Sequence, residues 1–206
     1  MQPSILNPSP AAAPKPQGAR LLIRFLIYAG SVIALLLIFF VAKFLFWAQC
    51  FQLRAFVARG GSMCPAVCED ERIIAGMDAF NARAPQRGEV IFFDQKESDT
   101  KFIKRVIAVA GDTVARGPSN TILVNNAPLM LPPPCGDNNA YAHLAAEGPP
   151  FETVKVPQGS LFVIGDNLDN SYDSRFFGLV PLNKVRGKAL LIYYSPNESR
   201  IGCRVN

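Results

Sequence analysis

The sequence Gly-Asp-Asn-Leu-Asp-Asn-Ser-Tyr-Asp-Ser-Arg, residues 165–175, follows a short apolar run at Leu161–Ile164. The apolar run is typical of a buried strand. Asp and Asn side chains bond to nearby backbone groups and shape tight turns, so the polar stretch predicts a compact loop after that strand. Hydroxyl, carboxylate and guanidinium groups crowd together in residues 171–175, which favours a functional site over a plain connection.

Length and composition predict one medium domain with an apolar appendage. The chain has 206 residues, of which 50% are hydrophobic and only 18% are charged, and a membrane segment explains this excess of apolar residues. The net charge is +5 at pH 7, but Lys and Arg are scattered and form no long basic run. This pattern favours membrane lipid as a partner and argues against nucleic acid.

The cysteine count leaves the disulfide pattern open. The five cysteines are Cys50, Cys64, Cys68, Cys135 and Cys203. An odd number cannot pair completely within the chain, although disulfides can form if the domain faces an oxidising compartment. A structural zinc site needs four ligands, usually Cys and His, and His143 is the single histidine. We therefore expect no metal and no cofactor.

The N-terminal part predicts a tail followed by a transmembrane helix. Residues 1–24 contain several prolines and an alanine run, which indicates a disordered tail. Residues 25–47 are apolar and, as a helix, would rise about 35 Å, more than a hydrocarbon core of about 30 Å. A cleaved signal peptide is the alternative, but its apolar run is usually about 7–15 residues and residues 48–50 make a poor cleavage site. Basic residues flank the helix on both sides, so charge alone does not give its orientation.

The rest of the chain, residues 48–206, predicts a mainly β domain. Short β-favouring runs are separated by Gly, Pro and Asn, and no convincing amphipathic helix pattern interrupts them. The runs are Glu89–Phe93, Phe102–Ala110, Thr121–Val124, Thr153–Val156, Leu161–Ile164 and Ala189–Tyr194. Many short strands of this kind indicate an all-β architecture.

Two residues are candidates for a catalytic pair. Ser62 follows two glycines, and Lys104 lies in an apolar strand. A serine hydroxyl needs an adjacent base, usually histidine, but His143 lies in a Pro/Gly-rich segment that predicts a solvated loop. A neutral lysine can serve instead, and burial among apolar groups lowers the pKa of an amine. Taken singly, the commoner interpretations are a Gly-Gly linker before Ser62 and a surface position for Lys104.

Three motifs together favour the catalytic interpretation. Residues 62–65 (Ser-Met-Cys-Pro), residues 102–106 (Phe-Ile-Lys-Arg-Val) leading to Gly111-Asp112, and residues 165–175 occur in this order after an apolar segment. In this order they resemble the signal peptidase I family, the membrane-bound Ser/Lys leader peptidases. The resemblance covers roughly residues 56–181. It implies a largely antiparallel β catalytic domain with a smaller inserted β subdomain, to which about residues 125–151 would belong.

The resemblance also implies a role for each site residue. Ser62 would be the nucleophile, Lys104 the general base, and Ser171 the residue that orients the lysine amine. Three charged residues would brace the site: Arg105, Asp173 and Arg175. Four apolar residues would line the substrate pocket: Met63, Val67, Phe102 and Ile103. The Ser62 backbone N–H would stabilise the oxyanion, but Gly60 replaces the serine that supplies a second donor in many family members.

The implied function is a serine endopeptidase that removes N-terminal signal peptides from secreted preproteins after Ala-x-Ala-like sites. The chain would be a single-pass protein of the bacterial inner membrane, with its catalytic domain on the periplasmic side. One alternative within the family is a specialised peptidase that processes conjugative pilus subunits. The other is a membrane-anchored β-domain that binds peptides without catalysis.

Overall fold

The computed structural model of the chain describes residues 17–50, 52–95, 101–131, 133, 135 and 151–205, with the side chains of 21–46 described in the first range. The chain divides into two compact units, Met1–Gln49 and Cys50–Asn206. The predicted loop around His143 and the tail residues 1–16 lie outside the described residues.

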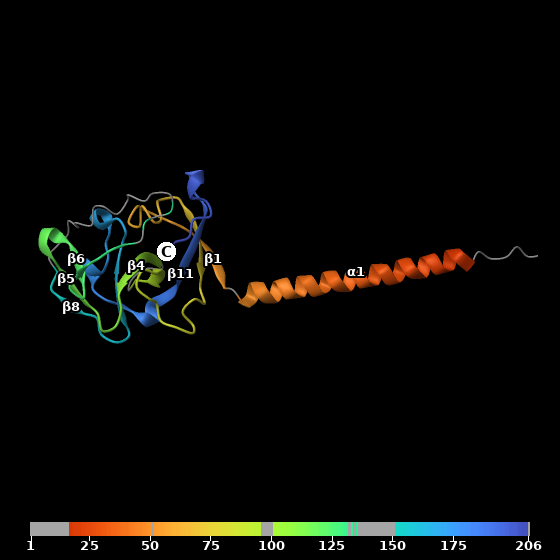
Figure 1. Cartoon of the computed structure of the whole chain (residues 1–206), viewed down its shortest axis with the longest axis horizontal. Coiled ribbons are helices and arrows are strands. Elements are labelled where there is room, and N and C mark those ends of the chain that lie inside the picture. Colours follow the sequence, from red (N-terminus) through yellow and green to blue (C-terminus); the bar gives the residue numbers. More distant parts are fainter. Residues whose placement is uncertain are drawn as a thin grey trace, which may run out of the picture. The chain divides into compact units, whose positions relative to one another are not determined.

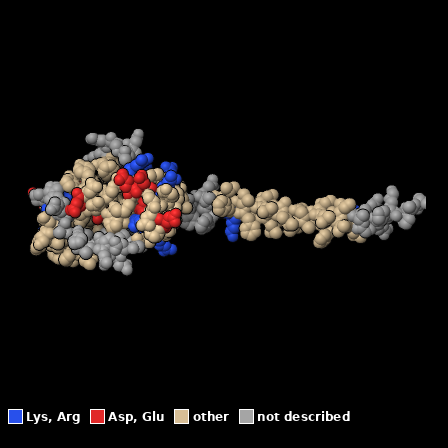
Figure 2. Space-filling view, turned by 90° about the horizontal axis from the view of Figure 1, so that it is seen from above, with Lys and Arg blue, Asp and Glu red and all other residues tan. Residues whose placement is uncertain are grey.

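In the described part of the first unit the chain forms one long helix, α1 (Gln17–Cys50), whose last residue falls in the second unit. Its segment Leu21–Phe46 has a mean hydropathy of 2.7 and is long and apolar enough to cross a membrane. Its side chains carry almost no charge, whereas the second unit displays many charged groups (Figure 2). The helix begins earlier than the predicted boundary at residue 25, so residues 17–24 belong to it and not to the tail. The physical reason is that Pro16 is the last proline before it, and most of the residues that follow, Gly18 excepted, are good helix formers.

The second unit is built on a seven-stranded antiparallel sheet. In spatial order its strands are β1 (Leu53–Val57), β2 (Arg72–Gly76), β11 (Val185–Tyr194), β3 (Val90–Asp94), β4 (Lys101–Ala108), β9 (Ser160–Ile164) and β10 (Val180–Pro181). All six pairs of neighbouring strands are antiparallel, with bulges in the pairs that involve β11 and at β4–β9. The strand β4, which carries Lys104, therefore lies between two buried neighbours.

A smaller four-stranded sheet is inserted between β4 and β9. Its order is β7 (Ala127–Pro128), β6 (Ile122–Val124), β5 (Thr113–Arg116) and β8 (Val154–Lys155), again antiparallel. Figure 1 shows β5, β6 and β8 gathered at the end of this unit away from β1 and β11. The expected mainly β fold is thus confirmed, and the smaller sheet begins near residue 113, ahead of the predicted region 125–151.

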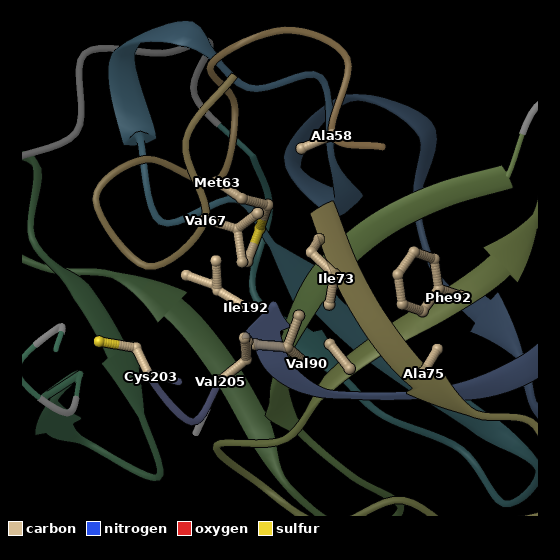
Figure 3. Packing of buried hydrophobic residues seen from close by; sticks show 11 residues of the cluster. Ala58, Met63, Val67, Ile73, Ala75, Val90, Phe92, Ile192, Cys203 and Val205 are labelled. Atoms are coloured by element: carbon tan, nitrogen blue, oxygen red, sulfur yellow. The ribbon is translucent and has the colours of Figure 1, made fainter. Parts of the chain in front are cut away.

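Alternating side chains of β3 fill both faces of the main sheet. Val90 and Phe92 belong to a buried cluster with Ile73, whereas Ile91 and Phe93 belong to a second cluster. This is the period of two that a strand imposes, here with apolar residues at every position because both faces are covered. Figure 3 shows the first cluster, which also fixes the loop that carries Ser62.

Short helical turns complete the second unit. They are η1 (Pro118–Asn120), η2 (Leu168–Asn170), α2 (Ser174–Phe177), η3 (Leu182–Lys184) and η4 (Glu198–Arg200). Two of them, η2 and α2, fall inside or directly after the polar stretch at residues 165–175.

Candidate active site

Ser62 lies in the loop between β1 and β2, which we call the Ser62 loop (residues 58–71). The loop is closed at its base, because Ala58 N–H donates to Glu71 O at 2.8 Å and Asp70 N–H donates to Ala58 O at 3.0 Å. Inside the loop, Val67 N–H donates to Met63 O at 2.9 Å and forms one helical turn after Ser62. The serine is therefore presented by a compact turn and not by an open linker.

The polar stretch predicted as a site contacts this loop directly. Asn167 N–H donates to Ser62 O at 3.1 Å, and the Asn167 side-chain amide donates to Gly61 O at 3.1 Å. The two segments are more than a hundred residues apart in the sequence. The end of β9 thus fixes the backbone on which Ser62 sits.

Lys104 meets Ser62 across the fold. Its Nζ lies 2.8 Å from Ser62 Oγ and 2.9 Å from Ile103 O, within hydrogen-bond distance of both. The lysine is only 4% exposed, and its Nζ lies 5.6 Å from the centroid of the Phe102 ring. Burial lowers the pKa of Lys104 to about 8, against the opposing influence of the Asp173 and Asp166 carboxylates. About one Lys104 amine in ten is therefore uncharged at pH 7, far more than for a lysine in water.

Ser171 is buried beside this pair without the expected contact to the lysine. Among the described residues, none makes a hydrogen bond with Ser171 Oγ. The hydroxyl packs against Gly165, next to the Ser62 carbonyl. A buried hydroxyl in this position is available to a neighbouring amine or to a bound peptide.

Two buried ion pairs hold the polar stretch. Arg105 binds Asp166 through two bonds of 2.8 Å and 2.6 Å, and both side chains are almost fully buried. Asp173 accepts from Arg175 Nε at 2.8 Å and from Gly165 N–H at 3.0 Å. The structure thus brings together all three residues expected to brace the site.

Asp166 is the member of this network that sequence reasoning missed. A signal was present, because an arginine in the middle of a buried strand needs a carboxylate partner. The strand β9 pairs with β4, which carries Arg105. Asp166, which lies two residues after the end of β9, is therefore the nearest candidate for that partner.

An apolar cleft of about 480 Å³ opens beside Ser62 and Lys104, which are both among its lining residues. Aromatic and aliphatic side chains from β1 to β4 line most of it: Phe56, Val57, Ile73, Phe92, Phe102 and Ile103. Of the four residues expected in the pocket wall, Phe102 and Ile103 are there. Met63 and Val67 are instead buried in the first core cluster, as Figure 3 shows, and are not among the described residues that line the cleft.

Gly60, which stands where many family members have serine, has a conformational reason to be glycine. Its φ is +78°, in the region that side chains rarely adopt. Its N–H donates to Glu69 Oε1 at 3.1 Å. A serine at position 60 would be strained in this backbone conformation. Glycine avoids the strain, and the hydroxyl that serine would supply is absent.

Within the part of the chain that the structure describes there are two disulfides, Cys64–Cys68 and Cys135–Cys203. The first lies inside the Ser62 loop, directly after the candidate nucleophile. The described residues contain no cluster of three or more His, Cys, Asp or Glu side chains that could hold a metal ion. The pairing could not be read from the sequence, because the spacing of five cysteines does not select one pattern.

The fold and the site define a class of protein: a β-domain hydrolase with a buried amine against a serine hydroxyl. The chain belongs to the signal peptidase family, peptidase S26, whose family model matches residues 29–194. It is 33% identical to the probable signal peptidase I-2 of Synechocystis over 69% of this chain and 66% of that protein. It is 32% identical to signal peptidase I of Leptolyngbya laminosa over 71% of this chain and 73% of that protein. A crystal structure of a signal peptidase I from Enterococcus faecalis matches 52% of this chain and 97% of its own, with 27% identity and a TM-score of 0.40.

Proposed function

We propose that this protein is a membrane-anchored signal peptidase I that removes N-terminal signal peptides from secreted preproteins. The observation that carries the proposal is the 2.8 Å contact between Lys104 Nζ and Ser62 Oγ, made by a buried lysine with a lowered pKa. Membership of the peptidase S26 family supports the same activity.

In the proposed reaction, the neutral Lys104 amine accepts the proton of the Ser62 hydroxyl. Ser62 Oγ then attacks the scissile carbonyl carbon, and the Ser62 backbone N–H stabilises the negative oxygen that forms. The lysine ammonium gives its proton to the departing amine, which leaves an acyl-enzyme on Ser62. The neutral lysine then removes a proton from water, and the resulting hydroxide attacks the acyl carbonyl carbon. The bond from that carbon to Ser62 Oγ breaks, the signal peptide leaves with a new carboxylate, and the lysine ammonium returns its proton to Ser62 Oγ.

The surrounding residues have supporting roles in this proposal. Ser171 orients the lysine amine by accepting a hydrogen bond from it, a contact that forms when one of the two side chains turns toward the other. The pairs Arg105–Asp166 and Asp173–Arg175 hold the polar stretch rigid, and so hold the Ser62 backbone through Asn167. Rigid support of this kind keeps the reacting atoms in place at no cost during the reaction.

The apolar cleft is proposed to select small side chains before the cleaved bond. Phe102 and Ile103 occupy part of its wall, and their bulk excludes large residues from an extended peptide. Signal peptides end in an Ala-x-Ala-like pattern, which suits such a wall. The exposed edge strand β1 offers unpaired backbone groups to which an extended substrate can add as a further strand.

The helix α1 is proposed to remain in the mature protein as its membrane anchor, with the second unit on the periplasmic side of the bacterial inner membrane. The length and hydropathy of Leu21–Phe46 support the anchor. The two disulfides support a compartment that is oxidising.

The test is cleavage of a purified secretory preprotein by the full chain in detergent, with Ser62→Ala as the matched variant. We expect the wild type to release a signal peptide that ends in a small residue and the variant to lose activity by at least about a thousandfold. A folded Ser62→Ala protein that cleaves at the wild-type rate would contradict the mechanism. A conjugative pilin precursor tested in parallel distinguishes a general from a specialised peptidase.

A further inference from the structure

A single guanidinium from the C-terminal segment holds the rear of the Ser62 loop. Arg200 Nη2 donates to Pro65 O at 2.8 Å and to Ala66 O at 3.1 Å. Both carbonyls lie inside the short ring closed by the Cys64–Cys68 disulfide. The contact therefore falls three and four residues after Ser62, on the turn that presents it.

The same guanidinium binds a buried carboxylate at the end of the loop. Arg200 Nε donates to Glu71 Oε1 at 2.6 Å, and Nη2 donates to Glu71 Oε2 at 3.1 Å. The Glu71 side chain is only 1% exposed, and it also accepts from Cys68 N–H at 2.8 Å. Burial raises the pKa of Glu71, but hydrogen bonds from Arg200, Cys68 and Ser195 outweigh that effect and lower it. The carboxylate stays charged, and it links Arg200 to the Cys68 end of the disulfide ring.

Arg200 is itself fixed in place. It ends the turn η4, which Asn197 caps by accepting from Ser199 N–H at 3.2 Å. Cys203 N–H donates to Arg200 O at 3.2 Å, and Cys203 forms the second disulfide, with Cys135. Arg200 therefore connects the Ser62 loop to the C-terminal segment around η4, which the disulfide of Cys203 anchors to the rest of the domain.

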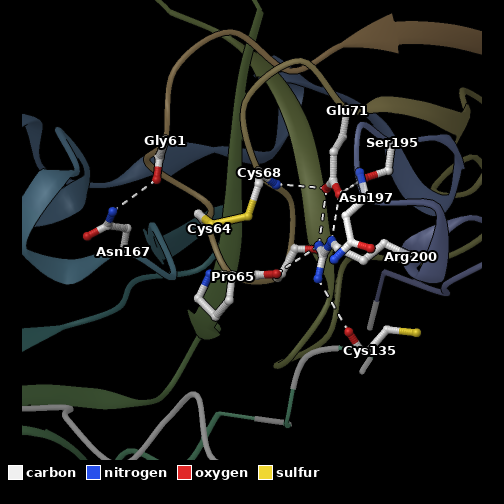
Figure 4. Close-up of a disulfide and its surroundings, with 11 residues drawn as sticks. Gly61, Cys64, Pro65, Cys68, Glu71, Cys135, Asn167, Ser195, Asn197 and Arg200 are labelled. Carbon is white, nitrogen blue, oxygen red and sulfur yellow. Dashed lines mark hydrogen bonds and ion pairs between the residues drawn. A yellow bond between two sulfur atoms is a disulfide. The ribbon is translucent and has the colours of Figure 1, made fainter. Parts of the chain in front are cut away.

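We propose that Arg200 is a positioning residue for catalysis, which holds the Ser62 loop from the side opposite to Asn167. Figure 4 shows the two attachments: Asn167 reaches Gly61 on one side, and Arg200 reaches Pro65 and Glu71 on the other. Attachment on both sides restricts movements of the loop that would carry the Ser62 hydroxyl away from Lys104. This inference rests on the proposed function of Ser62 and Lys104.

The chemistry of arginine explains why this residue type is needed. Its planar group presents five donors in a fixed fork, so it can bind two carbonyl oxygens and a carboxylate together. A lysine keeps the charge opposite Glu71, but its single nitrogen cannot reach all of these acceptors in the same geometry. The Arg200→Lys variant keeps the ion pair with Glu71 but loses the hydrogen bonds to the carbonyl oxygens. It therefore tests whether those hydrogen bonds are needed for activity.

The experiment measures kcat and KM for preprotein cleavage by the full chain in detergent, well below the unfolding temperature of each variant. We expect Arg200→Met and Arg200→Lys to lower kcat at least about tenfold with KM within about twofold, since the cleft is untouched. Arg83→Met is the matched control, because it removes an arginine that donates two hydrogen bonds to Glu89, outside the Ser62 loop. We expect it to lower the melting temperature and to keep the wild-type kcat.

Three results would overturn the proposal: a kcat for folded Arg200→Met within about twofold of wild type, an equal loss of kcat in Arg83→Met, or full activity in Arg200→Lys. If Arg200→Met does not fold, Arg200→Lys decides the question because it keeps the pair with Glu71. The Ser62→Ala variant in the same assay separates the two claims. Activity without the Ser62 hydroxyl contradicts the proposed function itself, whereas normal kcat in the Arg200 variants contradicts only this inference.

Discussion

A side chain on Gly165 would collide with the backbone of Ser62: a Cβ built there lies 2.3 Å from the Ser62 carbonyl oxygen. The same point lies 2.3 Å from Ser171 Oγ. These separations are far inside van der Waals contact, so the end of β9 can approach the Ser62 loop only because residue 165 has no side chain. The motif glycine is a packing requirement of the site.

Gly165→Ala is therefore expected to displace Ser62 or the polar stretch. We expect kcat to fall at least about a hundredfold and the free energy of unfolding to fall by about 1–3 kcal/mol, the usual cost of forcing extra volume into a packed site. Cleavage assays and thermal unfolding check this. Gly30→Ala is the control, because a Cβ at Gly30 meets nothing within 4 Å. Wild-type kcat in folded Gly165→Ala would show that the site tolerates the displacement.

Activity is expected to rise with pH as Lys104 loses its proton. Its pKa is lowered to about 8, so about one amine in ten is free at pH 7 and about nine in ten at pH 9. The acting form is the free amine, so kcat/KM should increase through pH 8 and then level off. The measurement is a pH profile of preprotein cleavage over a range in which the protein stays folded.

Variants of Lys104 provide the control for that profile. Lys104→Arg keeps the charge, but a guanidinium cannot give up its proton, so this variant should be as inactive as Lys104→Ala. His143→Ala should cleave at close to the wild-type rate. Substantial activity in Lys104→Arg, or loss only in His143→Ala, would assign the role of base to another group.

The order of the three motifs was enough to predict the Ser62–Lys104 pair, because each residue type and its neighbours were visible in the sequence. Strands with continuous apolar runs, such as β3 and β9, were also predicted. In contrast, β1 (Leu53–Val57) carries exposed side chains and an arginine. Because β1 lies at the edge of the sheet and its side chains are mostly exposed, its sequence shows no alternation of apolar and polar residues from which a strand could be predicted.

Contacts between residues far apart in the chain could not be predicted from the sequence. Arg200 reaches residues 65–71 from more than 120 positions away, and nothing near it in the sequence marks the contact. Met63 lies beside the candidate nucleophile, yet it is buried in the core and does not line the cleft. The direction of a side chain in a turn depends on the local backbone and on what packs against it, and neither is visible in residue spacing.

Ser171→Ala is expected to impair catalysis without abolishing it. The proposed role of the hydroxyl is to orient the Lys104 amine, while the proton passes between Lys104 and Ser62. We expect kcat to fall by about tenfold to a hundredfold, less than in Lys104→Ala. Because Ser171 Oγ makes no hydrogen bond with the described residues, its removal should leave stability almost unchanged. An unaltered kcat would exclude the orienting role.

Breaking the buried pair at Asp166 is expected to destabilise the fold strongly. Asp166→Asn leaves the Arg105 guanidinium charged in a site where both side chains are at most 1% exposed, which costs about 3–5 kcal/mol in comparable pairs. Asp94→Asn is the matched control, because Asp94 is 26% exposed and pairs with Lys101 and Arg186 at the surface. Its loss should cost no more than about 1 kcal/mol. Denaturant unfolding of both variants measures the difference, and equal losses would contradict the prediction.

The two disulfides are expected to contribute unequally to stability. Cys135–Cys203 joins residues 68 positions apart, whereas Cys64–Cys68 joins residues 4 positions apart. A cross-link stabilises mainly by restricting the unfolded chain, and the restriction grows with the length of the closed loop. On that basis the double serine variant of Cys135 and Cys203 should lose about 4 kcal/mol, and that of Cys64 and Cys68 about 2 kcal/mol. Unfolding of both variants beside the reduced wild type measures these losses. A larger loss in the Cys64 and Cys68 variant would mean that the short ring stabilises the folded Ser62 loop directly and does not act through the unfolded chain.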